Sequence, residues 1–110
     1  MTTTLRLTLL AAALALSGAA QAADLEAGKK KAQDVCQACH GMDGLSAASP
    51  EYPKLAGQHP DYLAKALRDY KSGARKHPVM GAMAAGLTTK DIADVTAYYA
   101  AQGGPLHSAF

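Results

Sequence analysis

The 110-residue sequence has no tryptophan and a single phenylalanine, Phe110, at its C-terminal end. It has only two cysteines, and it contains no run of β-branched residues that would predict a strand. A domain of this size buries only about 60–65% of the surface that its unfolded chain exposes. With so few large side chains the polypeptide forms a thin core, and we expect a bound cofactor to complete it.

The charged residues are nearly balanced, with 11 Lys and Arg against 9 Asp and Glu. A domain that binds nucleic acid carries a clear excess of basic side chains on one face. The composition therefore predicts no nucleic-acid partner.

The first 22 residues have the features of a secretory signal peptide. They carry one charge, Arg6, then an apolar stretch from Leu7 to Ala20, and they end in Ala20-Gln21-Ala22. The stretch is shorter than the roughly 20 residues that span a bilayer. We expect cleavage of residues 1–22, a single periplasmic domain over residues 23–110 in a bacterium, and no stable membrane insertion. The alternative is a buried N-terminal helix.

Residues 36–40 read Cys-Gln-Ala-Cys-His, the pattern of covalent c-type haem attachment. Cys36 and Cys39 are three residues apart, so on a helical turn both thiols lie on one side and reach the two vinyl groups of one porphyrin. His40 follows directly, and its imidazole is placed to bind the iron as the proximal ligand. The motif therefore predicts one covalent haem c with its iron.

Two other sites use cysteines at this spacing. A thiol–disulfide redox site belongs to thioredoxin-like chains, which contain strands that this sequence does not predict. A zinc site would need a second cysteine pair or histidines at zinc-finger spacing, and the sequence has neither. We therefore interpret the motif as a haem attachment site.

Three helical stretches are predicted, separated by loops over residues 41–53 and 72–87. The first runs from about Leu25 to Cys39, where Gly28 suggests the close approach of another helix. The second begins with Pro60 at its first position and is closed by Gly73. In this second helix Leu63 and Leu67 are expected to face the core. The third helix is predicted to begin at Thr88 or Thr89, where Asp91 forms a capping box, and to end before Gly103.

The axial position of the iron opposite His40 requires a second ligand from the protein. Met80 and Met83 lie in the second long loop, and a thioether on iron raises the reduction potential, which suits an electron carrier. Core filling is the alternative role for any single methionine. His77 is a third candidate, disfavoured because Pro78 restricts its backbone. Spacing alone leaves the choice between Met80 and Met83 open.

The mature chain resembles a class I cytochrome c of the cytochrome c4 and c-553 group over essentially its whole length. A single C-x-x-C-H motif makes it similar to the single-haem form, and the resemblance implies an all-α fold with three main helices around one haem. The residues that carry the resemblance are Val35–Gly41, Tyr52–Gln58, Tyr62-Leu63, Leu87–Asp91 and Ala97-Tyr98-Tyr99.

The resemblance also implies the remaining site residues. In this group the iron-binding methionine lies seven residues before the leucine that opens the last helix, which selects Met80 and leaves Met83 as a packing residue. A proline carbonyl accepts the N–H of the proximal imidazole, and the matching residue here is Pro53. Such a bond fixes the ring and strengthens the ligand.

These features predict a periplasmic electron carrier, not an enzyme, whose iron cycles between Fe(II) and Fe(III) with His/Met ligation. We expect a redox protein donor and acceptor that dock transiently at the exposed haem edge, with this chain acting as a monomer or as a subunit of a redox complex. The alternatives are a permanent subunit of a dehydrogenase or oxidase, and a peroxidase or gas-binding haem with an open distal site. Basic side chains that could steer an acidic partner are Lys29, Lys30, Lys31, Lys54, Arg75 and Lys76, although a solvated helix face explains the lysine triplet equally well.

Overall fold

The computed structural model describes residues 22–107, so the predicted signal peptide lies outside the described residues except for Ala22. Within this range the chain forms helices and loops and has no strand, which confirms the all-α class. None of the described helices has the length and apolarity needed to cross a membrane. The elements are α1 (Leu25–Lys31), a π-helical segment η1 (Ala32–Cys36), α2 (Gln37–His40), α3 (Pro60–Ser72), α4 (Pro78–Ala85) and α5 (Thr89–Ala100).

The first predicted helix is present over nearly its predicted length, but it is not one continuous α-helix. The side chain of Asp24 caps α1 by accepting from the backbone N–H of Ala27 at 3.0 Å. After Lys31 the backbone widens into η1, whose end is marked by a bond from the Gln37 N–H to the Ala32 carbonyl. Short π-helical segments occur frequently at functional sites. Here the segment leads directly into the C-x-x-C-H motif.

The signals predicted for α3 and α5 are confirmed. Pro60 stands at the start of α3, and Gly73 closes it in the left-handed conformation with φ +84°. At α5 the Thr88 hydroxyl accepts from the Asp91 N–H at 3.0 Å, and the Asp91 carboxylate accepts from the Thr88 N–H at 2.9 Å. This reciprocal capping box fixes where the last helix begins.

The prediction of a loop over residues 72–87 is wrong, because residues 78–85 form α4. The His77 side chain caps this helix, with Nδ1 accepting from the N–H groups of Val79 and Met80 at 3.2 Å each. Pro78 at the first position needs no intrahelical partner. The fold therefore has a fourth substantial helix besides the three that were predicted.

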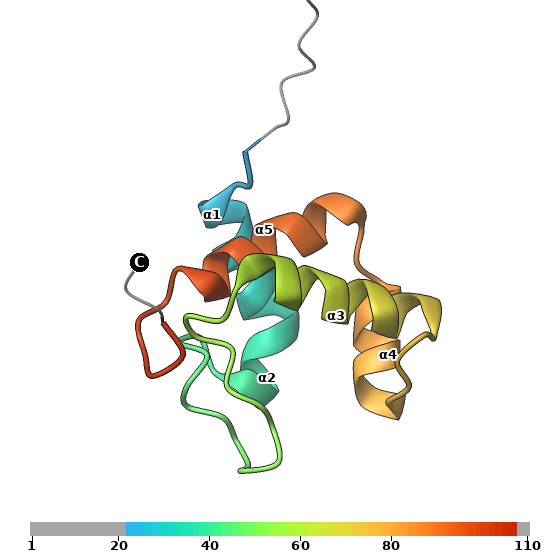
Figure 1. Ribbon diagram of the computed structural model, residues 1–110, viewed down its shortest axis with the longest axis horizontal. Helices are drawn as coiled ribbons and strands as arrows, with labels where there is room; N and C mark the ends of the chain where they lie inside the picture. Colours follow the sequence, from blue (N-terminus) through green and yellow to red (C-terminus); the bar gives the residue numbers. More distant parts are fainter. Residues whose placement is uncertain (1–21, 108–110) are drawn as a thin grey trace, which may run out of the picture.

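The helices pack around a small core in which α1 crosses α5, and α3 lies against both α4 and α5 (Figure 1). The tight cluster at the centre consists of Ala32, Leu63, Val95 and Tyr99. Of the eight buried hydrophobic residues in the described part, three are alanines, so the polypeptide contributes little apolar volume of its own. The predicted role of Leu63 holds, and Leu67 packs against this cluster from its edge.

Candidate functional site

His40 is the last residue of α2 and is one of the few buried polar side chains, with 6% of its surface exposed. Its Nδ1 lies 2.9 Å from the carbonyl oxygen of Pro53. A carbonyl only accepts, so Nδ1 donates in this bond, and Nε2 is the ring nitrogen left to bind a metal. A neutral imidazole with one nitrogen bonded and the other available is the arrangement that metal-binding histidines adopt.

The two cysteines of the motif are half-buried free thiols, Cys36 at the end of η1 and Cys39 in α2. Burial raises the pKa of the Cys36 thiol to about 11, against a smaller opposing effect of the Lys31 charge. Cys36 is therefore a neutral thiol at pH 7 in this environment. Cys39 lies close to Tyr52, whose pKa is raised chiefly by the negative charge that Cys39 carries when ionised.

The loop after the motif folds back so that Pro53 reaches His40. The Asp43 carboxylate accepts from the backbone of Leu45 and Ser46 at 2.9 and 2.8 Å and from the Ser46 hydroxyl at 2.7 Å. The Ser46 hydroxyl and these backbone groups hold the pKa of Asp43 at about 2. A further bond joins the Leu55 N–H to the Gly44 carbonyl at 2.9 Å and closes the loop.

Two tyrosines of α5 reach this loop from the other end of the chain. The Tyr99 hydroxyl donates to the Gly41 carbonyl at 2.9 Å, and the Tyr98 hydroxyl donates to the Met42 carbonyl at 2.8 Å. Their rings meet edge to face, with centroids 5.2 Å apart. Sequence reasoning missed these contacts, and the adjacent tyrosines near the end of α5 were the only sign of them.

Met80 and Met83 differ in their exposure. Met80 is half-buried near the start of α4, whereas 43% of the Met83 side chain is exposed. The packing role expected for Met83 stays a prediction, as does the choice of Met80 as the iron ligand. His40 on α2 and Met80 on α4 belong to helices that stand apart beneath α3 (Figure 1).

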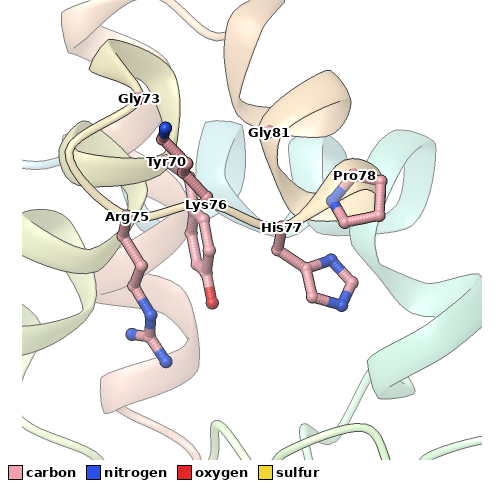
Figure 2. A pocket seen from close by; sticks show the side chains of 7 residues that line it. All are labelled: Tyr70, Gly73, Arg75, Lys76, His77, Pro78 and Gly81. Atoms are coloured by element: carbon pink, nitrogen blue, oxygen red, sulfur yellow. The ribbon is translucent and has the colours of Figure 1, made fainter.

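The segment between α3 and α4 carries a group of basic and aromatic side chains beside a shallow hollow (Figure 2). The Arg75 guanidinium lies 4.8 Å from the centroid of the Tyr70 ring, a cation–π distance. The His77 ring meets Tyr70 edge-on at 6.4 Å. In Figure 2 the side chains of Tyr70, Arg75 and His77 point in the same direction, away from the backbone of this segment.

The predicted basic residues fall into two groups. Lys31 pairs with Asp91 at 3.4 Å and so links α1 to α5. The others are exposed: Lys29, Lys30, Lys54, Arg75 and Lys76.

Comparison with known proteins identifies the family. Residues 25–101, from the first residue of α1 to the residue after α5, match the family model described as Cytochrome c. The chain belongs to the cytochrome c family. The resemblance expected from the sequence is thereby confirmed.

Individual similar proteins show which members of the cytochrome c family the chain resembles. The chain is similar to cytochrome c4 of Thiocapsa roseopersicina, with 48% identity over 86 residues that cover 78% of this chain and 44% of that protein. It is 45% identical to cytochrome c-554(548) of Halomonas halodenitrificans, covering 74% of this chain and 99% of that protein. The fold matches the reduced recombinant cytochrome c4 from Pseudomonas stutzeri with a TM-score of 0.68 and 42% identity, over 76% of this chain and 47% of that one.

The chain spans less than half the length of the cytochrome c4 relatives that it matches, whereas it covers the cytochrome c-554(548) almost completely. The cytochromes c carry covalently bound haem c with iron, as the motif predicted. The residues present fit this group: two half-buried thiols three residues apart, and a buried imidazole whose Nε2 is available. The small, alanine-rich core fits it as well, because a haem provides apolar surface that the side chains lack.

Proposed function

We propose that residues 1–22 are a signal peptide and that residues 23–110 form a monohaem electron-transfer domain of the bacterial periplasm. When bound, the haem supplies a one-electron couple between Fe(II) and Fe(III). The observation that carries the proposal is the bond between His40 Nδ1 and the Pro53 carbonyl beside an intact C-x-x-C-H motif. In this domain the polypeptide binds and insulates a redox centre, and it acts as a carrier and not as an enzyme.

The attachment residues follow from the motif and its surroundings. Cys36 and Cys39 would form the two thioethers, and His40 would be the proximal ligand through Nε2. The Pro53 carbonyl holds the imidazole in one orientation and increases its electron donation through the Nδ1–H bond. Pro53 therefore acts on the iron through His40.

Met80 is the proposed distal ligand. Its side chain is half-buried, and it lies on a helix separate from the one that carries His40. Its position seven residues before Leu87 is the spacing that the resemblance implied. His77 is a weaker candidate because its Nδ1 already caps α4, which ties its ring to the backbone of Val79 and Met80. With both axial positions filled, no position remains for a substrate.

Redox proteins are the proposed partners, docking transiently through exposed basic side chains. Arg75 and Lys76 lie side by side in the segment before α4, and Lys54 directly follows Pro53. Such charges attract an acidic partner in a salt-dependent manner. Lys31 contributes less to this attraction, because Asp91 already pairs with it.

The test is to express the full chain in a periplasm that matures c-type cytochromes and to record visible spectra of the purified protein in both oxidation states. We expect the mass of one attached haem, low-spin spectra in both states and repeated reversible cycling. High-spin bands, or binding of carbon monoxide without displacement of a ligand, would contradict the proposal and favour a peroxidase or gas-binding haem. Co-purification in a fixed ratio with a dehydrogenase or oxidase would instead indicate the subunit alternative.

One matched pair and one set of cysteine variants extend this test. His40→Ala is expected to abolish the low-spin spectrum, whereas His59→Ala, at an exposed position before α3, is expected to leave it unchanged. Cys36→Ala and Cys39→Ala should each reduce covalent attachment, and the double variant should carry no covalent haem. A double variant that retained haem through denaturing electrophoresis would contradict the assignment.

A further inference from the structure

The backbone immediately after His40 is held by hydrogen bonds from a helix that is distant in the sequence. Tyr99 bonds to the Gly41 carbonyl and Tyr98 to the Met42 carbonyl, 58 and 56 residues away along the chain. These are the first two carbonyls after His40. Their positions therefore determine how the chain leaves α2.

Tyr99 is built into the core, with only 2% of its surface exposed. Burial is the main cause that raises the pKa of its phenol above the ordinary value, so the hydroxyl stays protonated and donates. A further bond runs from the Gly57 N–H to the Tyr99 backbone carbonyl at 3.0 Å. Tyr99 thus contacts the loop through its ring, its hydroxyl and its backbone.

The exit from α2 is geometrically tight. Gly41 has φ +76°, and an ideal Cβ on it would lie 2.8 Å from the Ser46 carbonyl oxygen. The Ala48 N–H bonds to the Cys39 carbonyl at 3.0 Å, which ties the same loop back to α2. Only the φ and ψ angles of Gly41 separate its carbonyl from the His40 peptide unit, so the Tyr99 bond to this carbonyl restrains the backbone that leaves His40.

We propose that Tyr98 and Tyr99 are positioning residues for His40. Pro53 holds the imidazole from one side through Nδ1, and the two hydroxyls hold the backbone that follows the ring. Together they keep the Nδ1–H bond to Pro53 intact and Nε2 directed at one point. This inference rests on the proposed role of His40 as the proximal ligand, and it assigns to α5 a part in setting the ligand's orientation.

The test uses the reduced holoprotein and follows the His40 Nδ1–H by NMR. In Tyr99→Phe we expect its exchange with solvent to be faster by about tenfold, the factor that corresponds to loss of one hydrogen bond of typical net strength. Tyr98→Phe should produce a smaller increase, because its bond is one residue further from His40. If Tyr99→Phe yields no folded holoprotein, the increase expected in Tyr98→Phe decides the proposal.

Two controls separate positioning from general stability. Tyr62→Phe removes the hydroxyl of a tyrosine that is 54% exposed and should leave the exchange unchanged. Val95→Ala removes buried core volume from α5, so it should lower the unfolding temperature without changing the exchange under strongly native conditions. Equal exchange in Tyr99→Phe and the wild type, or an equal increase in Val95→Ala, would overturn the proposal. If the wild-type His40 ring showed no haem-shifted signals, the proposed ligation itself would fail, and this inference with it.

Discussion

Gly28 of α1 lies directly against the backbone of Asp94 in α5, where an ideal Cβ on the glycine would be 2.0 Å from the Asp94 carbonyl oxygen. The same Cβ would lie 3.0 Å from the Cβ of Tyr98. Gly28 is buried in the middle of α1, and no other residue type fits this crossing. The close approach that Gly28 suggested in the sequence is therefore confirmed, and the cost of a helical glycine is offset by the contact that it permits.

Gly28→Ala is expected to destabilise the protein by about 3 kcal/mol or more, at the upper end of the range for overpacking, because the added methyl meets backbone instead of a side chain that can move. The measurement is the free energy of unfolding of the holoprotein in denaturant. Gly86→Ala is the control, since Gly86 has a right-handed backbone conformation and its Cβ would lie no closer than 3.9 Å to the Met83 carbonyl oxygen. An equal loss of stability in both variants would contradict this account of the crossing.

We expect the α1–α5 contact to depend on pH through Asp94. Its carboxylate is buried, forms an ion pair with Lys90 and accepts from the Asp24 N–H at 2.9 Å. The Lys90 side chain first, and the Asp24 N–H second, lower the pKa of Asp94 below its usual 3.8. A folded pKa below the unfolded one means that Asp94 stabilises the fold fully above about pH 4, and that this contribution is lost as pH falls through the lowered folded value.

Asp94→Asn should therefore cost about 1–2 kcal/mol at neutral pH, because the charged hydrogen bonds become neutral ones or are lost. The free energy of unfolding of the variant should also fall less steeply than that of the wild type below pH 4. Unfolding curves in steps from pH 7 to pH 2 measure both effects. Asp34→Asn, at an exposed position in η1, serves as the control, and a wild-type pH dependence in Asp94→Asn would refute the prediction.

Local signals explain which helices could be predicted from the sequence. Pro60 with Gly73, and Thr88 with Asp91, act within a few residues of the helix ends that they define, so their spacing alone predicts those ends. At α4 the cap is a histidine, which is not among the usual capping residues. The helix was missed because its start depends on a side chain whose capping role sequence rules do not assign.

At the site, the sequence predicts the motif residues but not the hydrogen bonds between residues that are distant in the sequence. The motif itself identifies Cys36, Cys39 and His40, because the chemistry needs those residue types at that spacing. The bond from His40 to Pro53 spans 13 residues and was expected only from the family resemblance. The bonds of Tyr98 and Tyr99 depend on how α5 crosses α1, which is set by packing and has no local sequence signature.

The His77 cap is a further testable feature. His77→Ala should weaken α4 by about 0.5–2 kcal/mol, because the N–H groups of Val79 and Met80 lose their acceptor. His77→Asn should restore most of that stability, since asparagine is a preferred cap. Thermal unfolding of the holoprotein measures both. If His77 were an iron ligand, both variants would instead lose the low-spin spectrum, and the asparagine would rescue nothing.

The choice between the two methionines of α4 can be decided by one spectroscopic band. Ligation of a thioether to Fe(III) gives a sulfur-to-iron charge-transfer band, and we expect Met80→Ala to abolish it and to lower the reduction potential, because the thioether favours reduced iron. Met83→Ala is the matched control, since it removes the same side chain three residues further along the same helix, at a position that is 43% exposed. It should retain the band and the potential. Loss of the band in Met83→Ala alone would assign the ligand to Met83 and would require α4 to turn its exposed face toward the iron.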